Sequence, residues 1–171
     1  MAEHIWLIGM MGSGKSTVGR QLGERLGWEW LDLDEFIAQQ VGTSITGFWA
    51  DRGEEAFRSI EVEAVRTVAS EANSVVATGG GVIMREANVV MMRSSGFVVW
   101  LQATPDTLVR RIGSGASRPL LHEGERLATL TELLEEREAA YEAAAHVIVA
   151  TDDLPIGAVV ERIEELWTEF R

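Results

Sequence analysis

The chain has 171 residues, with 15 basic and 27 acidic side chains, a formal net charge of −12 and no cysteine. The lack of cysteine excludes disulfides, thiolate metal sites and a cysteine nucleophile, and the acidic balance argues against nucleic acid as a main partner. Lys15 is the only lysine, which excludes GTPases that need a second lysine to read guanine and protein kinases that need one on a strand.

Apolar runs in the first half of the chain predict three strands, over residues 4–8, 28–32 and 74–78. A glycine-rich loop over 9–14 separates the first strand from an amphipathic helix that ends at Gly27. A second helix follows over about 34–41, with Asp34 as its cap and Gly42 at its end. Residues 43–53 predict a short helical or turn segment, and a long amphipathic helix runs from about residue 54 to 70.

The second half continues the alternation of strands and helices. Strands are predicted over 97–101 and 146–149, and helices over about 86–93, 127–145 and 155–170. Thr104 caps a further helix that has Pro105 at its first position, and residues 113–124 have the composition of a mobile loop. Five apolar strands alternating with helices predict an α/β fold, with a parallel sheet covered on both faces, in one domain over residues 1–171.

The hydropathy of the chain gives no sign of a membrane. No apolar stretch approaches the roughly 18 residues that span a bilayer. The N-terminus lacks the basic and apolar regions of a signal peptide. Residues 118–171 hold 13 acidic and 5 basic side chains, an excess typical of solvated helix faces. We therefore expect a soluble, cytoplasmic protein without a membrane partner.

Residues 9–16 match the complete phosphate-loop pattern, Gly-x-x-x-x-Gly-Lys-Ser. The glycines let the backbone curl so that successive N–H groups point at anionic oxygens, and the following helix aims its positive end at the same place. Lys15 can reach β- and γ-phosphates, and the Ser16 hydroxyl can ligate Mg²⁺. Because the pattern lies between a buried strand and an amphipathic helix, it favours nucleotide phosphate binding over an ordinary glycine turn.

Two carboxylates, Asp32 and Asp34, stand at the end of the second predicted strand. Ligands bind at the carboxyl ends of strands in open α/β sheets, and alternation along an extended backbone would place both side chains on one side. One carboxylate could hold Mg²⁺ while the other accepts a hydrogen bond or proton from a hydroxyl. The alternative is that Asp34 only caps the helix, but the phosphate loop favours ligand binding.

Six motifs, in order along the chain, resemble the shikimate kinase family. They are the phosphate loop over 9–17, the segments 31–34, 53–61, 78–81 and 118–121, and Arg137 with Tyr141. The resemblance implies the fold of nucleoside monophosphate kinases, a three-layer α/β/α arrangement with strand order 2-3-1-4-5. It also implies a substrate-binding segment over about 34–61 and a lid over about 113–124.

The resemblance implies the reaction as well. This is transfer of the γ-phosphoryl group of ATP to the 3-hydroxyl of shikimate, on the route to chorismate and the aromatic amino acids. The enzyme is expected to be a monomer that uses Mg²⁺ with ATP, and its partners are expected to be ATP and shikimate rather than nucleic acid.

The same resemblance assigns roles to individual residues. The expected catalytic groups are Lys15, Asp34 and Arg118. The nucleotide is expected at Gly12, Ser13, Gly14, Lys15, Ser16, Thr17, Arg111 and Arg118, and Mg²⁺ at Ser16 and Asp32. Shikimate is expected at Asp34, Arg58, Glu61, Gly79, Gly80, Gly81 and Arg137. Arginine forks bind carboxylates bidentately, and glycine backbone N–H groups can approach a ligand closely, so the residue types suit these tasks.

Some residues keep alternative interpretations. Glu61 either holds Arg58 in place on one helix face or forms only an exposed ion pair with it. Trp49 either lines the substrate pocket or packs in the interior. His146 stands where the family often has Asp, which is expected to affect only the entry to the last strand. The stretch 151–155 is expected to cover the adenine opposite Arg111, and three tryptophans are expected in the core, Trp6, Trp28 and Trp100.

Two other functions remain open on the residues alone. Gluconate is also a hydroxylated carboxylate, so a gluconate kinase would need similar groups. A nucleotide-binding regulator would use the phosphate loop without transferring phosphate, but it would leave Asp34, Arg58 and Arg137 without a task.

Overall fold

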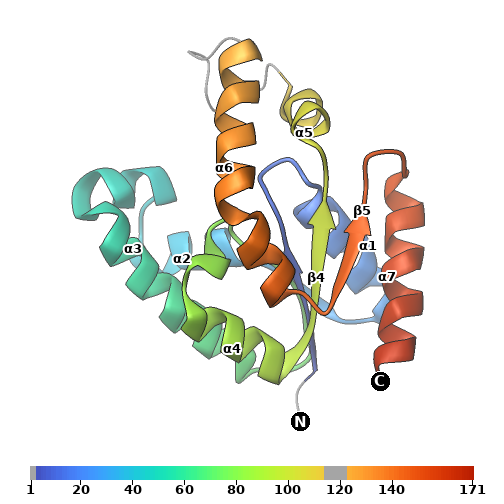
Figure 1. Cartoon of the computed structure of the whole chain (residues 1–171). Helices are drawn as coiled ribbons and strands as arrows, with labels where there is room; N and C mark the ends of the chain where they lie inside the picture. The colour runs from blue at the N-terminus through green and yellow to red at the C-terminus, as the bar shows by residue number, and fades with distance from the viewer. Residues whose placement is uncertain (1–2, 114–122) are drawn as a thin grey trace.

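The structure, a computed structural model, describes residues 3–113 and 123–171. Its centre is a sheet of five parallel strands in the order β2-β3-β1-β4-β5 (Figure 1). The strands are β1 His4–Ile8, β2 Glu29–Asp32, β3 Ser74–Ala77, β4 Gly96–Gln102 and β5 Val147–Ala150. The predicted α/β fold and its strand order 2-3-1-4-5 are confirmed.

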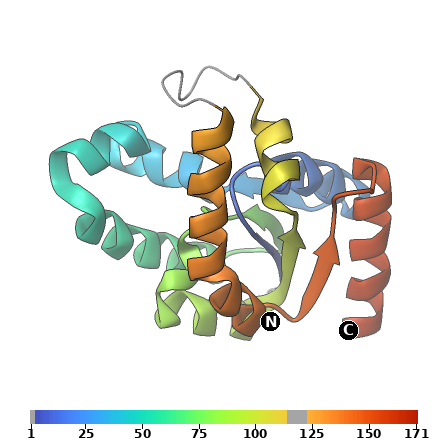
Figure 2. The same cartoon turned by 45° about the horizontal axis from the view of Figure 1, so that its top comes forward.

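Helices cover both faces of this sheet. They are α1 Lys15–Leu26, α2 Leu33–Val41, α3 Ile45–Ala69, the 3₁₀ turn η1 Val82–Met84, α4 Glu86–Ser95, α5 Pro105–Ile112, α6 Glu123–Ala144 and α7 Ile156–Phe170. Alternate side chains of β1 pack on opposite faces, Trp6 and Ile8 on one and Ile5 and Leu7 on the other. The first face is covered by α3, α4 and α6 and the second by α1 and α7 (Figures 1 and 2).

Helix α3 is broken at Gly53, whose φ of 81° and ψ of 173° are not helical. Glycine adopts such a conformation at little cost because it has no Cβ. The break matches the prediction of a short helical or turn segment over 43–53 followed by a long helix, and of the two the structure shows a helical one; the bend is visible in Figure 1. The short first part carries Trp49, and the long second part carries Arg58 and Glu61.

The start of α2 differs from the prediction. Asp32, not Asp34, caps this helix, because its Oδ1 accepts hydrogen bonds from the backbone N–H groups of Asp34 at 3.0 Å and Glu35 at 3.2 Å. The chain is already helical at Leu33, so the alternation of an extended strand does not place Asp34. The first turn of α2 places it instead, which frees its side chain from any capping task.

Two further predictions concern the tryptophans of the core and the entry to β5. Trp6 and Trp100 are buried strand residues as predicted, but Trp28 precedes β2 and is only half-buried, edge-on to Trp167 at 5.8 Å between ring centroids. His146 pairs with Val98 at the entry to β5: its backbone N–H donates to the Val98 carbonyl, and its Nδ1 accepts from the Val98 N–H. None of the helices described is long and apolar enough to cross a membrane.

Candidate active site

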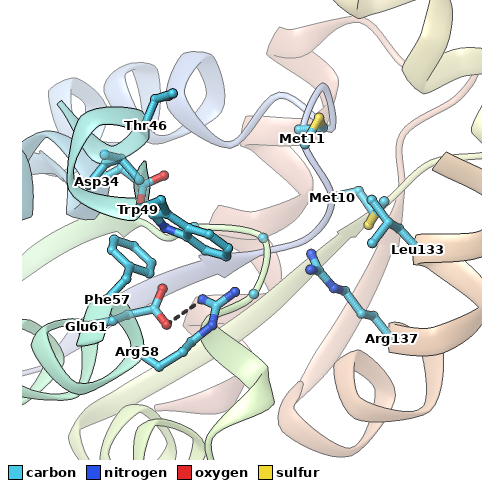
Figure 3. Close-up of a pocket in the computed structure, with 14 residues that line it drawn as sticks. Met10, Met11, Asp34, Thr46, Trp49, Phe57, Arg58, Glu61, Leu133 and Arg137 are labelled. Atoms are coloured by element: carbon cyan, nitrogen blue, oxygen red, sulfur yellow. Dashed lines mark hydrogen bonds and ion pairs between the residues drawn. The ribbon is translucent and has the colours of Figure 1, made fainter. Parts of the chain in front are cut away.

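Three strands of the parallel sheet end at one edge, and the predicted motifs follow those ends. The phosphate loop follows β1, Asp32 closes β2, and the glycine triplet at 79–81 comes two residues after β3. The carboxyl ends of parallel strands meet at the same edge, where α/β proteins bind their ligands. A pocket of about 420 Å³ opens beside the phosphate loop (Figure 3), lined by Met10, Met11, Asp34, Ile45, Thr46, Trp49, Phe57, Arg58, Glu61, Gly79, Gly80, Gly81, Leu133 and Arg137.

The phosphate loop has the backbone that its glycines predict. Gly9, Gly12 and Gly14 all have positive φ, at 145°, 80° and 95°. Lys15 is buried, and its Nζ donates to the carbonyls of Gly9 at 2.8 Å and Met10 at 2.9 Å. Burial lowers the pKa of Lys15 to about 8, against the opposing charges of two nearby aspartates. The lysine is therefore held within the loop, at the start of α1.

The remaining loop residues divide between interior and surface. Ser13 is buried, and its backbone N–H donates to the Met10 carbonyl at 3.2 Å, which closes the loop. Thr17 is exposed in the first turn of α1 beside Ser16. The first turn of this helix, with its unpaired N–H groups, faces the same edge of the sheet as the pocket, as an anion site requires.

Ser16 and Asp32 form the pair that was predicted to hold Mg²⁺. The Ser16 hydroxyl donates to Asp32 Oδ2 at 3.0 Å, which brings two hard oxygen donors together at the edge of the phosphate loop. Across residues 3–113 and 123–171, no group of three or more His, Cys, Asp or Glu side chains could hold a metal alone. A nucleotide-bound Mg²⁺ takes most of its ligands from phosphate and water, so this pair fits it.

Arg58 is fixed from several sides. Its Nη1 donates to Glu61 Oε1 at 2.9 Å, its Nη2 lies 3.5 Å from Glu54, and its guanidinium faces the rings of Trp49 and Phe57 at 5.6 and 5.4 Å from their centroids. Arg58 is 7% exposed and Glu61 is fully buried, so the ion pair belongs to the interior rather than to the surface. Trp49 lines the pocket and also packs on Phe57, so both of its predicted roles hold.

Asp34 is a half-buried carboxylate and Glu61 a fully buried one. Burial raises the pKa of Asp34, and the neighbouring charge of Asp32 raises it further, while Lys15 and Arg58 act in the opposite direction. Burial likewise raises the pKa of Glu61, against the charge and hydrogen bond of Arg58. Asp34 therefore lies within electrostatic reach of both the phosphate-loop lysine and the buried arginine.

The glycine triplet leaves room for three charged side chains. A Cβ at Gly79 would lie 2.8 Å from Asp34 Oδ1, one at Gly80 would lie 3.4 Å from Arg137 Nη1, and one at Gly81 would lie 2.7 Å from Arg58 Cζ. Sequence reasoning explained these glycines by close approach of their backbone to a ligand. Because each charged group packs directly on the glycine backbone, the triplet also determines where those groups lie.

Arg111 and Thr151 lie together at the other side of the phosphate loop. The Arg111 guanidinium donates to the Thr151 carbonyl at 2.7 Å, to the Thr151 hydroxyl at 2.9 Å and to the Ser13 carbonyl at 3.4 Å. Asp152 ties the same segment to the start of α5, because its Oδ1 accepts from the N–H and hydroxyl of Thr104 at 2.9 and 2.7 Å. The two segments expected around the adenine are thus adjacent.

Some pocket residues were missed by sequence reasoning, and one predicted residue falls outside the part of the chain that the structure describes. Met10, Met11, Ile45, Thr46 and Leu133 line the pocket, yet no motif singles them out. Met10 and Met11 lie at the variable positions of the phosphate loop, and Ile45 and Thr46 lie within the predicted substrate segment over about 34–61, so their place in these segments could have suggested them. The predicted lid arginine, Arg118, lies outside the residues that the structure describes, as does most of the predicted lid over 113–124.

Comparison with known proteins gives one consistent family. A family model described as shikimate kinase matches residues 11–167. A curated shikimate kinase from Moorella thermoacetica is 43% identical over 172 residues, which cover 99% of this chain and 98% of that protein. A solved structure of shikimate kinase from Acinetobacter baumannii, in complex with shikimate, aligns over 100% of this chain and 96% of its own with a TM-score of 0.91 and 32% identity.

More distant structures share the fold alone. A gluconokinase from Sinorhizobium meliloti aligns over 98% of this chain and 95% of its own, with a TM-score of 0.62 and 20% identity. At that identity the similarity concerns the arrangement of helices and strands, and it carries nothing about the acceptor.

Proposed function

The chain belongs to the shikimate kinase family, and from this premise we propose that its pocket binds shikimate and presents one hydroxyl to the γ-phosphate of ATP. The chain is an enzyme, a kinase, and its reaction converts shikimate and ATP into shikimate 3-phosphate and ADP. That reaction serves aromatic amino acid synthesis.

The observation that supports the proposed site best is the convergence of Arg58, Arg137 and Asp34 on one pocket beside the phosphate loop. Shikimate is a small ring with one carboxylate and three hydroxyls. Two guanidinium groups suit its carboxylate, since the planar fork of arginine matches two carboxylate oxygens. Asp34 interacts electrostatically with both Lys15 and Arg58, so it suits the hydroxyls of shikimate that lie nearer the phosphates. Glu61 acts through Arg58, which it holds in place.

The proposed chemistry follows from these positions. Asp34 accepts a hydrogen bond from the reacting hydroxyl and takes its proton as the oxygen bonds to the γ-phosphorus, while the bond from that phosphorus to the β-phosphate oxygen breaks and ADP leaves; a loose transition state needs little help from a base. Lys15 and the loop N–H groups hold the β- and γ-phosphates. Ser16 and Asp32 hold Mg²⁺, which supplies neutralisation of the charge on the phosphate oxygens when it is bound.

Nucleotide binding extends along the loop and beyond it. Gly12, Ser13, Gly14 and Thr17 surround the phosphates in this proposal, and Arg111 with residues 151–155 flanks the adenine. Arg118 closes over the nucleotide and stabilises charge on the transferred group. The same proposal takes the chain as one domain with a substrate segment over 34–61 and a lid over 113–124, acting as a cytoplasmic monomer without nucleic-acid or membrane partners.

A coupled assay of ADP release, run with shikimate and gluconate side by side, tests the proposal. Shikimate is expected to stimulate ADP release above the basal ATPase rate, and gluconate is not. The Lys15→Met protein, purified in parallel, serves as the control for contaminating kinases. Stimulation by gluconate alone would favour a gluconate kinase, and no stimulation by either compound would favour a nucleotide-binding regulator.

A further inference from the structure

Tyr141 is a buried polar side chain that the proposed chemistry does not use. It is fully buried on α6, four residues after Arg137 and therefore on the same face of the helix. Its ring stacks on Trp100 of β4, with centroids 5.4 Å apart and an angle of 21° between the planes. This packing fixes the ring, so the direction of its hydroxyl is fixed as well.

The hydroxyl of Tyr141 reaches the glycine triplet. It donates to the Gly80 carbonyl at 2.5 Å, across 61 positions of the sequence. A Cβ built at Gly80 would lie 3.4 Å from Arg137 Nη1 and 3.6 Å from the Tyr141 hydroxyl, so all three groups meet at one point. A buried carbonyl that lost this donor would keep the cost of its desolvation without a hydrogen bond in return.

Arg137 is the other neighbour of this hydroxyl. Burial raises the pKa of Tyr141 to about 12, against the charge and the side-chain hydrogen bond of Arg137. The hydroxyl proton goes to the Gly80 carbonyl, and the Arg137 guanidinium lies on the same side of Gly80 as the phenol oxygen. In Figure 3 the Arg137 side chain extends from α6 into the pocket, opposite Arg58.

The two arginines are thus held by different means. Arg58 is held by the carboxylates of Glu61 and Glu54 and by aromatic rings. For Arg137 the structure provides a phenol that is itself tied to the backbone of the substrate pocket. A neutral phenol orients the guanidinium without neutralising it, and this leaves the positive charge available for an anionic ligand.

We propose that Tyr141 is a positioning residue for binding of the acceptor. Its hydroxyl fixes the Arg137 guanidinium relative to the Gly80 backbone, so that both contact shikimate at once. The inference rests on the proposed function, because it concerns how the same pocket recognises its carboxylate. Tyr141 does not line the pocket, so it acts through Arg137 and Gly80 and not by touching the substrate.

The test is Tyr141→Phe, which keeps the ring stacked on Trp100 and removes only the hydroxyl. We expect KM for shikimate to rise about tenfold, as for loss of one hydrogen bond at a charged group, while KM for ATP and kcat stay within about twofold. Thr131→Val is the matched control, because it removes from the same helix a hydroxyl that bonds only its own backbone at Leu127 and lies outside the pocket. Its kinetic constants are expected to match those of the unmodified protein.

A double-mutant cycle separates positioning from a purely structural role. In an Arg137→Ala background, Tyr141→Phe should raise KM for shikimate by less than about threefold, because residues that act through each other are not additive. An undiminished effect in that background contradicts action through Arg137. A lower unfolding midpoint with unchanged KM for shikimate overturns the inference, as does an equal rise of both KM values. An unmodified protein without shikimate-dependent ADP release contradicts the proposed function itself, which is a different result.

Discussion

Replacing Gly81 by alanine tests the claim that the glycine triplet makes room for the charged groups of the pocket. The backbone of Gly81, with φ −99° and ψ 6°, is open to an L residue, so alanine strains nothing there by itself. The new methyl group, however, would clash with the Arg58 guanidinium: its closest contact would be Nη2, and it would lie 2.7 Å from both Cζ and Nη1, at least 0.7 Å short of an ordinary contact of 3.4 Å. The guanidinium must therefore move.

The size of the effect follows from what holds Arg58. A shift of this size lengthens the 2.9 Å bond to Glu61 beyond hydrogen-bond range and leaves a fully buried carboxylate poorly paired. Removing one partner of a buried pair costs about 3–5 kcal/mol, and overpacking costs about 1–3 kcal/mol. Since Arg58 moves but remains present, we expect a loss of about 2 kcal/mol in the free energy of unfolding. The displaced guanidinium should also raise KM for shikimate about 30-fold.

Urea denaturation and steady-state kinetics measure these two effects. Gly157→Ala is the matched control, because a Cβ there meets nothing within 4 Å and the residue lies in the first turn of α7, where alanine should stabilise by at most about 1 kcal/mol. Gly80→Ala provides a second comparison within the triplet, since its closest contact would be an ordinary 3.4 Å. The reasoning is refuted if Gly81→Ala is as stable as Gly80→Ala and keeps the KM of the unmodified protein.

Three further predictions concern single charged groups. Arg58→Ala should raise KM for shikimate at least about 100-fold with little change in KM for ATP, and it should lower the free energy of unfolding by about 3–5 kcal/mol because Glu61 loses its partner. Arg66→Ala, on the exposed face of α3, is the control. An equal loss of affinity for both substrates would contradict a carboxylate-binding role. Because burial lowers the pKa of Lys15 to about 8, kcat/KM for ATP should fall as the pH rises above 8 and the lysine loses its charge, and a profile that stays flat to pH 10 would count against this. The pKa of Asp152 is lowered to about 2, mainly by the hydroxyl of Thr107. Asp152→Asn should therefore lose about 1 kcal/mol of stability at pH 7, after allowance for screening, and this difference should shrink as the pH falls from 4 towards 2. A stability difference that does not change with pH would contradict this prediction.

The elements that could be predicted were those with a strong periodic or motif signal. The three central strands β1, β3 and β4 are buried on both faces and appear as short, largely apolar runs, so hydropathy alone predicts them. The break in α3 at Gly53 also falls where the prediction divides the segment 43–53 from the long helix that begins near residue 54. The cap of α2 was assigned to Asp34 instead of Asp32. Aspartate is a common N-cap residue, and two aspartates only two positions apart cannot be told apart as caps from local sequence.

The candidate site shows the same division. Lys15 was predicted from the phosphate-loop pattern, and Arg58 was predicted from the family resemblance of the segment around it. Met10 and Leu133 were not, because an apolar side chain that lines a pocket looks the same in sequence as one that fills a core. Trp49 kept two interpretations for this reason, and contact with both Arg58 and Phe57 resolved them.

The sequence by itself predicted a nucleotide phosphate at Lys15, because a glycine loop between a strand and a helix makes an anion site from local geometry alone. It also supplied the residue types of the acceptor site. Only the tertiary structure decided how these groups meet. Asp34, Arg137 and Arg58 come from three different helices, and each packs on one glycine of the 79–81 triplet. Such contacts depend on strand order and helix packing, which bring together residues as far apart as Gly80 and Tyr141, and no local pattern encodes that distance.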